Sequence, residues 1–218
     1  MRLRNIPGAK ETVAGHSACI PEESAPAGRW QAIFGNAHPI HVEIGTGKGQ
    51  FITTLAERHP EINYIGIERY DSVLVRALEK LDARKEPLPN LRFIRMDAEN
   101  ICAMFAEGEA AHIYLNFSDP WPKVRHAKRR LTSAEFLKRY ERILTSDGEI
   151  EFKTDNTDLF SFSLGQAEQS GWKVSGCTWN LHRDAAMNAE NVMTEYEERF
   201  SAQGNPICKM ILSRRHTD

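Results

Sequence analysis

Residues 112–131, HIYLNFSDPWPKVRHAKRRL, join an apolar run, an acidic loop and a cluster of cations in one continuous stretch. The run from His112 to Phe117 is short and mostly apolar, which predicts a buried strand of an α/β sheet. Asp119 follows, and the prolines at positions 120 and 122 prevent the chain from continuing as strand or starting a helix before Trp121. We therefore expect a stiff loop that presents a carboxylate and an indole where such sheets bind ligands, at the carboxyl end of a strand.

The second half of this stretch is strongly basic. Five of the eight residues from Lys123 to Arg130 are Lys or Arg, and His126 lies among them. Because the formal net charge of the whole chain is -2, a nucleic-acid partner is indicated only by this local cluster. A basic run alone more often marks a solvated face, and a Pro-Trp-Pro turn alone is more often a packing corner. Their combination at a strand end favours a functional site.

The composition limits the possible classes of protein. With 218 residues, 41% hydrophobic and 27% charged, we expect an irregular arm over residues 1–28, where Pro and Gly recur, and a single domain over residues 29–218. No apolar run reaches the roughly 18 residues of a membrane helix, and the start lacks a signal peptide, so we expect a cytoplasmic protein. The four cysteines are widely spaced, which predicts neither a disulfide framework nor a metal site.

A glycine-rich turn follows the first expected strand, residues 39–44. Gly45, Gly47 and Gly49 separate this strand from an amphipathic helix that continues to about His59. The turn does not fit a Walker loop, because Lys48 is followed by glycine and the upstream glycine is missing. It does not fit the dinucleotide fingerprint either, because position 50 is Gln. The remaining pattern, E-x-G-x-G-x-G, begins at Glu43, and a carboxylate there favours a ligand group of positive charge over a phosphate.

An acidic residue lies at or just after the end of each of the first four expected strands. Glu43 is the penultimate residue of the first strand, Glu68 follows residues 62–67, Asp97 follows residues 91–96, and Asp119 comes after the fourth strand. A single acidic residue at a strand end is more often a surface cap or a turn residue. Four of them, at the carboxyl ends of successive strands, predict a ligand site along one rim of the sheet.

The remaining pattern predicts three more strands and two more long helices. A helix is expected from a capping box at Thr132 and Glu135 to about Leu144, and another before Ser170. Strands are expected at residues 149–153, 172–181 and 207–212. The acidic segment from Met193 to Phe200 reads equally well as an ordinary surface helix or as part of the site.

The blocks NFSDPWPK (116–123), FKTDN (152–156) and MTEYE (193–197) resemble the bacterial single-chain tRNA (guanine-N7)-methyltransferases, and the glycine turn is similar to the first motif of class I S-adenosylmethionine-dependent methyltransferases. The resemblance covers nearly the whole chain from Trp30 onward. It implies a Rossmann-like α/β fold, a seven-stranded, mostly parallel sheet with helices on both faces. It also implies transfer of a methyl group from S-adenosyl-L-methionine to N7 of a guanine in the tRNA variable loop, which gives 7-methylguanosine.

The resemblance further implies roles for individual residues. Asp119 would be the catalytic residue, and no metal would take part. The cofactor would be bound by Glu43, Gly45, Gly47, Glu68, Asp97 and Asp119. The substrate would be bound by Lys123, Asp155, Thr194, Glu195, Tyr196 and Glu197, and RNA by Arg125, His126, Lys128, Arg129 and Arg130. The tRNA would be the partner of a monomer or homodimer.

Two other readings of the same residues stay open. An Asp-Pro-aromatic arrangement is also found in enzymes that methylate exocyclic amines of nucleic acids, so an amino-methyltransferase is the first alternative. A non-catalytic RNA-binding module with a methyltransferase fold is the second. This chain departs from the family pattern at Val124, Ala127 and Gly8, where relatives commonly have Lys, a polar residue and Trp. These departures bear on the basic arm and the N-terminal segment, whereas the NFSDPWPK block is intact.

Overall fold

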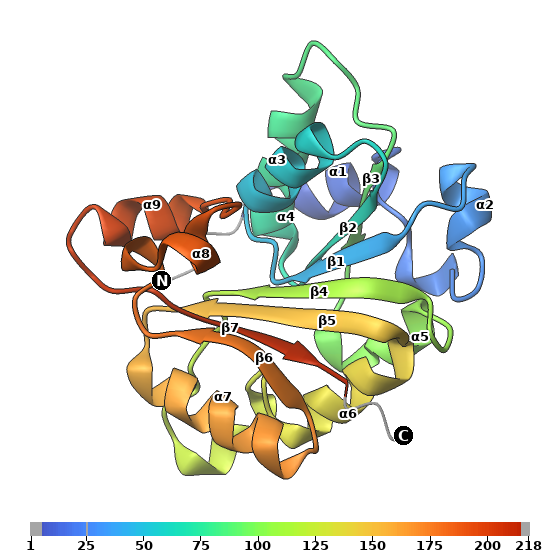
Figure 1. Cartoon of the computed structure of the whole chain (residues 1–218). Helices are drawn as coiled ribbons and strands as arrows, with labels where there is room; N and C mark the ends of the chain where they lie inside the picture. The colour runs from blue at the N-terminus through green and yellow to red at the C-terminus, as the bar shows by residue number, and fades with distance from the viewer. Residues whose placement is uncertain (1–5, 25, 215–218) are drawn as a thin grey trace. The chain divides into compact units, whose positions relative to one another are not determined.

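The chain is an α/β protein with one seven-stranded mixed sheet, as its sequence predicts. The computed structural model describes residues 6–24 and 26–214, and the strand order of its sheet is β3-β2-β1-β4-β5-β7-β6 (Figure 1). The chain divides into two compact units, Met1–Ala106 and Glu107–Asp218, which are described separately below. Within residues 6–24 and 26–214, no helix is long and apolar enough to cross a membrane.

The first unit is built on three parallel strands, β1 (Ile40–Ile44), β2 (Asn63–Glu68) and β3 (Leu91–Arg95). Val42 pairs with Ile65 across β1 and β2, and Ile67 pairs with Ile94 across β2 and β3. All of β2 is buried, which explains why the stretch from Tyr64 to Ile67, between the polar ends of the strand, is apolar without polar alternation. The bounds of the three strands agree closely with those expected.

Helices α2 (Trp30–Phe34), α3 (Gln50–Arg58), α4 (Asp71–Asp82) and α5 (Ile101–Met104) complete the first unit, with a 3₁₀ turn, η2, at Ala98–Asn100. Trp30 is fully buried, and its indole Nε1 donates to the carbonyl of Met104 at 2.8 Å. Its ring stacks on Phe105 with 5.6 Å between centroids. A buried indole of this kind contributes both apolar area and a satisfied donor.

The N-terminal arm is more regular than the sequence analysis expects. Residues Ala9–Gly15 form helix α1, residues Glu22–Ser24 form a 3₁₀ turn, η1, and α1 buries Ala9 and Val13. Between them, Ala18 and Ile20 exchange backbone hydrogen bonds of 2.8 Å with Phe93 of β3. The expectation of irregular structure over residues 1–28 is therefore wrong for these segments, because long-range pairing orders them. Residues 1–5 and 25 of the arm lie outside the described residues.

The second unit contains β4 (Ala110–Asn116), β5 (Leu144–Thr154), β6 (Lys173–Thr178) and β7 (Cys208–Ser213). β4 and β5 are parallel, and β7 is antiparallel to both β5 and β6. β5 begins earlier than expected, immediately after the preceding helix. Its register against β4 shifts between Ala110 and His112, so Asp147 and Gly148 lie in an irregularity of the strand and do not precede it.

The longer helices of this unit, α6 (Ala134–Ile143) and α7 (Thr157–Gln169), lie side by side below the strands in Figure 1. The N-cap of α6 is Ser133, so the expected capping box at Thr132 is wrong. Thr132 is buried, and its hydroxyl pairs with that of Ser163 in α7 at 2.6 Å. The side chain of Gln166 caps the helix instead, since its Oε1 accepts from Ala134 N at 2.9 Å.

Shorter segments carry most of the expected substrate and RNA residues. The basic arm is a 3₁₀ helix, η3 (Val124–Arg129), and a further 3₁₀ turn, η4, covers Leu181–Arg183. Two short helices, α8 (Ala185–Asn188) and α9 (Glu195–Ser201), follow in the loop between β6 and β7. These segments are too short to be stable as isolated helices, so contacts with the rest of the second unit must hold them in place.

Candidate active site

In the first unit, the three expected carboxylates follow neighbouring parallel strands at the same edge. Glu43 lies near the end of β1, Glu68 is the last residue of β2, and Asp97 follows β3. Parallel pairing brings the carboxyl ends of these strands together. The arrangement matches the position at which open α/β sheets bind ligands, and it places three acidic side chains on one edge of a single rigid unit.

The Glu43 carboxylate is buried and is held by the loop that follows it. Only 1% of the residue is exposed, and its Oε2 accepts from the hydroxyl of Thr46 at 2.7 Å. A buried carboxylate is costly unless hydrogen bonds or positive charge compensate it. The Thr46 hydroxyl supplies one such hydrogen bond.

Glu68 connects the end of β2 to the glycine turn. Its Oε2 accepts from the backbone N–H of Gly47 at 3.0 Å, and its Oε1 accepts from the N–H groups of Arg69 and Tyr70 at 2.8 and 3.0 Å. These three bonds fix the orientation of the carboxylate. Glu68 thus organises the turn in addition to any contact that it makes with a ligand.

The glycines of the turn have two different structural roles. Gly45 and Gly47 both have positive φ, at 82° and 58°, and a Cβ added at either would meet nothing within 4 Å. Their backbone therefore lines open space, which allows a ligand to approach closely. Gly49 differs, because a Cβ there would lie 2.8 Å from that of Ala77 in α4. It is needed for helix packing.

Asp97 is joined to a cation that the sequence analysis did not single out. Its Oδ2 lies 3.2 Å from Nε of Arg69, and its Oδ1 accepts from Glu99 N at 3.1 Å as the N-cap of η2. Both partners of the ion pair are substantially exposed, so it contributes little to stability. It nevertheless orients the carboxylate. Arg69 directly follows Glu68, a position that the sequence alone does not distinguish from an ordinary surface arginine.

In the second unit, Asp119 lies in a loop with two unusual backbone conformations. Asp119 itself is exposed, while Phe117 and Trp121 have positive φ values of 51° and 42°. Non-glycine residues seldom adopt such angles, which cost on the order of 1 kcal/mol or more each and are kept only where surrounding contacts enforce them. Unfavourable backbone angles thus lie on both sides of the carboxylate.

Asp155 follows β5 in the way that Asp119 follows β4. The two strands are parallel with Asn116 opposite Lys153, and Phe117 N donates to the carbonyl of Lys153 at 2.8 Å. Both carboxylates therefore lie just after the carboxyl ends of neighbouring parallel strands.

Tyr196 packs beside this edge and holds Asp155. Its hydroxyl donates to Oδ2 of Asp155 at 3.0 Å, and its ring lies 4.8 Å from that of Phe117 and 4.1 Å from that of Phe200, between centroids. Burial, and then the charge of Asp155, raises the pKa of Tyr196 to about 12. The phenol consequently stays protonated at neutral pH and acts as a hydrogen-bond donor.

Glu197 cannot play the part of an exposed substrate ligand in this arrangement. It is fully buried, its Oε2 lies 2.7 Å from Nζ of Lys153, and its Oε1 accepts from Asn191 at 2.7 Å. Its own N–H donates to the hydroxyl of Thr194, the N-cap of α9, at 3.0 Å. The contacts of Glu197 support a structural role in place of the expected one, whereas Tyr196 and the half-buried Glu195 stay near the surface.

Some side chains of the basic arm are exposed, and others contact neighbouring side chains. Lys123 and Arg125 are exposed, and Lys128 pairs with Glu135 at 3.2 Å. Arg129 lies over the indole of Trp121 at 5.1 Å, and the ring of His126 meets that indole edge-on at 5.5 Å. Trp121 is therefore packed within the arm. Exposed arginines and lysines of this kind suit phosphate contacts.

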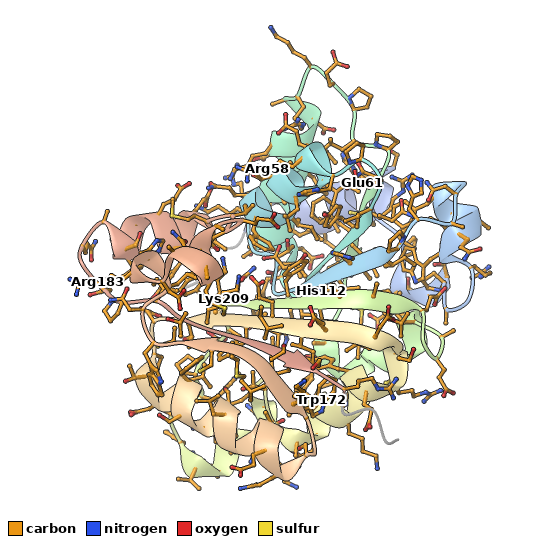
Figure 2. All side chains as sticks on the ribbon, viewed as in Figure 1. Arg58, Glu61, His112, Trp172, Arg183 and Lys209 are labelled. Carbon is orange, nitrogen blue, oxygen red and sulfur yellow. The ribbon has the colours of Figure 1, made fainter. Side chains whose placement is uncertain are left out.

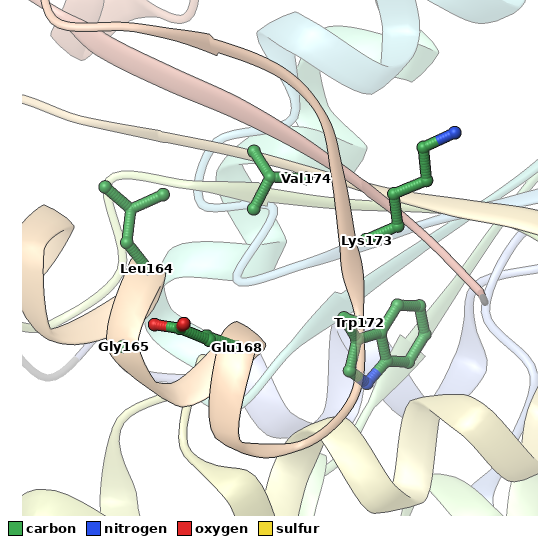
Figure 3. Close-up of a pocket in the computed structure, with 6 residues that line it drawn as sticks. All are labelled: Leu164, Gly165, Glu168, Trp172, Lys173 and Val174. Atoms are coloured by element: carbon green, nitrogen blue, oxygen red, sulfur yellow. The ribbon is translucent and has the colours of Figure 1, made fainter.

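A groove elsewhere in the second unit does not coincide with these residues. It has a volume of about 560 Å³ and lies between α7 and β6 (Figure 3). Its lining residues are Leu164, Gly165, Glu168, Trp172, Lys173 and Val174. None of its lining residues is predicted to act in catalysis or to bind cofactor, substrate or RNA. The presence of a groove therefore does not by itself identify the site.

Comparison with known proteins identifies the family. A family model described as "Putative methyltransferase" matches residues 37–210. A tRNA (guanine-N(7)-)-methyltransferase of Lachnoclostridium phytofermentans is 55% identical over 214 residues, covering 98% of this chain and 99% of the relative. One of Geobacillus thermodenitrificans is 53% identical, covering 96% and 95%. The chain belongs to the tRNA (guanine-N(7)-)-methyltransferase family.

Solved structures agree with this family at the level of the fold. A 16S rRNA methyltransferase, KamB, aligns with a TM-score of 0.64 at 13% identity, covering 86% of this chain and 94% of that one. An antibiotic-related methyltransferase aligns with a TM-score of 0.62 at 19% identity, covering 85% and 92%. At such low identity these similarities establish the methyltransferase fold alone.

Two residues make contacts that the sequence does not predict. The sequence predicts Lys153 only as the end of a strand, but it forms a buried ion pair with Glu197. It predicts Arg130 as one more RNA-binding cation, but the guanidinium donates to the carbonyls of Pro120 and Trp121. A lysine in an otherwise apolar strand, FKT, two residues before Asp155 is a signal for a buried ion pair, because isolated buried lysines are rare. Nothing in the sequence distinguishes Arg130 from its neighbours in the basic run.

Proposed function

We propose that this chain is a tRNA (guanine-N7-)-methyltransferase. It transfers the methyl group of S-adenosyl-L-methionine to N7 of a guanine in the tRNA variable loop and so forms 7-methylguanosine. The observation that carries the proposal is the glycine turn of the first unit with its edge of three carboxylates, in a chain 55% identical to a named methyltransferase over 98% of its length. The proposed place of action is the cytoplasm, as a monomer or homodimer.

The residues of the first unit fit the proposed cofactor. Glu43, which is buried, suits the positively charged end of a methionine moiety, and Gly45 and Gly47 leave their backbone open to it. Glu68 and Asp97 offer acceptor oxygens to ribose hydroxyls and to the adenine. When bound, S-adenosylmethionine supplies an electrophilic methyl group attached to a positively charged sulfur.

Guanine N7 has an in-plane lone pair and no proton, so its methylation requires no base to activate it. Residues of the second unit therefore serve to position the base and to stabilise charge. Asp119, the proposed catalytic residue, and Asp155 accept hydrogen bonds from guanine N1–H and N2–H. These bonds orient the base and stabilise the positive charge that develops on it. The Tyr196 hydroxyl keeps Asp155 in one orientation.

The basic arm would hold the tRNA through its phosphates. Lys123 and Arg125 are the exposed cations nearest to the Asp119 loop in sequence. Phosphate contacts fix register and orientation without reading the bases. Selectivity would therefore come from the shape of the tRNA and from presentation of the target guanine out of its stack.

The test is transfer of a labelled methyl group from S-adenosylmethionine to unmodified tRNA, with the product nucleoside identified by mass and retention. We expect 7-methylguanosine. A nucleoside methylated on an exocyclic amine would replace the proposal by an amino-methyltransferase. Binding of both cofactor and tRNA without transfer would replace it by an RNA-binding module.

A further inference from the structure

Arg130 contacts the loop that carries Asp119. Its Nε donates to the carbonyl of Pro120 at 3.0 Å, and its Nη2 donates to the carbonyl of Trp121 at 3.2 Å. These carbonyls belong to the two residues that directly follow Asp119. The fork of a guanidinium can span two adjacent acceptors, which the single ammonium of a lysine cannot do in the same geometry.

The same guanidinium packs against the ring of a phenylalanine in a helix. Its Cζ lies 4.2 Å from the centroid of the Phe162 ring, and Phe162 is part of α7. The side chain is half-buried, unlike the exposed Arg125 and Arg129. Arg130 therefore connects a loop of unfavourable backbone conformation to one of the longest helices of the second unit.

The loop needs such a connection on this side. At its start, Phe117 is held by a backbone bond to Lys153 in β5 and by its ring contact with Tyr196. At its end, Trp121 has a φ of 42°, and prolines on either side of it donate no backbone hydrogen bonds. The bonds from Arg130 fix the carbonyls there, and Arg129 and His126 add only ring contacts.

We propose that Arg130 is a positioning residue for Asp119 and does not bind phosphate. The expected fall in the rate of methyl transfer rests on the proposed function. The expected displacement of the Asp119 loop does not. Loss of the fork allows the loop to relax and displaces the carboxylate. A displacement of about 1 Å at a reacting group can reduce the rate by roughly 10²-fold.

The experiment compares Arg130→Lys and Arg130→Met with Arg125→Lys and Arg125→Met in the full chain. For Arg130→Lys we expect kcat to fall by at least about tenfold, while the tRNA dissociation constant and the salt slope of binding stay as in the unaltered protein. For Arg125→Met we expect the slope of log K against log salt to decrease by about 1, and Arg125→Lys should restore it. A near-normal kcat in Arg130→Lys, or a reduced salt slope in Arg130→Met with normal kcat, would overturn the proposal.

A readout independent of methyl transfer separates this inference from the proposed function. With 5-fluorotryptophan in place of the four tryptophans, the Trp121 resonance can be assigned through Trp121→Phe. Arg130→Lys should shift or broaden that resonance and leave those of Trp30 and Trp172 unchanged. If the unaltered protein transfers no methyl group, the proposed function fails, while this spectrum still tests the connection. An unchanged Trp121 resonance would overturn the inference whatever the activity.

Discussion

Asp119 is exposed on a loop whose backbone is fixed on both sides. The sequence predicts stiffness there from two prolines, and the structure adds positive φ values at Phe117 and Trp121. Local preference gives no hint of these angles, since aromatic residues avoid them. Strain of this kind persists at functional sites because neighbouring contacts enforce it. At the scale of single residues, the sequence thus indicates which side chains the loop carries but not the backbone angles of Phe117 and Trp121.

Replacement of Asp119 by Asn should separate charge from shape at this position. Because the side chain is exposed, we expect Asp119→Asn to fold normally. Loss of the negative charge beside a base that becomes positive should lower kcat by roughly 10²-fold. Steady-state kinetics of methyl transfer provide the measurement. Asp158→Asn, at an exposed aspartate in the first turn of α7, is the matched control, and equal kcat values in the two variants would remove Asp119 from the catalytic role.

The segment that contains α9 is held to β5 by a fully buried ion pair. Nζ of Lys153 lies within 3.0 Å of Glu197 Oε2, Asn191 Oδ1 and the carbonyl of Val192. Both charged side chains have no exposed area. Seven residues of helix cannot be stable alone, so this network determines where Tyr196 stands relative to Asp155. The family motif around α9 combines a structural carboxylate with a surface phenol.

Removal of the cation should destabilise the chain strongly. Lys153→Met removes the ammonium from the buried Glu197 carboxylate and leaves it the Asn191 amide and His182 Nε2, at 2.7 and 3.3 Å, which we expect to reduce the free energy of unfolding by about 3–5 kcal/mol. The double variant Lys153→Met, Glu197→Leu should recover a large part of this loss, because it buries no unpaired charge. Urea titrations followed by circular dichroism give both values. A double variant less stable than Lys153→Met would contradict the proposed pairing.

Helices and strands were predicted well where local apolar periodicity determines them. They were predicted poorly where contacts with residues far away in sequence determine them. The strands of the first unit and helices α3 and α7 follow apolar periodicity and lie close to their predicted bounds. The cap of α6 was misassigned because the Thr132 hydroxyl is turned to Ser163, far away in sequence. Helix α1 was missed because its burial depends on the packing of a short segment. Neither tertiary contact can be read from neighbouring residues.

At the scale of the whole molecule, one histidine makes stability depend on pH. His112 of β4 and Lys209 of β7 are labelled in Figure 2. Burial, and then the charge of Lys209, lowers the pKa of His112 from 6.5 to about 4. Above pH 6.5 both folded and unfolded chains carry it neutral. Between 6.5 and 4 only the unfolded chain takes up the proton, so this histidine makes the folded state less stable as pH falls.

His112→Gln should remove that part of the acid sensitivity. We expect the loss of unfolding free energy between pH 6.5 and 4 to be smaller in the variant, by up to ~1.4 kcal/mol per pH unit. Any constant packing cost of the substitution appears at neutral pH and does not change the comparison. His38→Gln, at an exposed histidine, is the control. Parallel pH profiles for His112→Gln and the unaltered protein would show that His112 does not titrate as described.

The types of side chain at the candidate site are predictable from the sequence, whereas the contacts that these side chains make are not. Carboxylates after successive strands and cations after Asp119 could be read directly from the sequence, because strand ends and charge runs are local features. The burial of Glu197 and the engagement of Arg130 by loop carbonyls could not. Both depend on which elements pack together, and residues of the same type next to them have different surroundings.

The position of β7 has a consequence for synthesis on the ribosome. This strand is the last of the sheet in the chain, yet it lies between β5 and β6 and hydrogen-bonds to both. The three strands of the first unit can pair as soon as Arg95 has emerged. In the second unit, β6 must wait for Cys208–Ser213 before it gains its neighbour. A nascent chain therefore carries an incomplete second unit until Ser213 has emerged, and a product terminated before β7 would expose unpaired strand edges to chaperones and proteases.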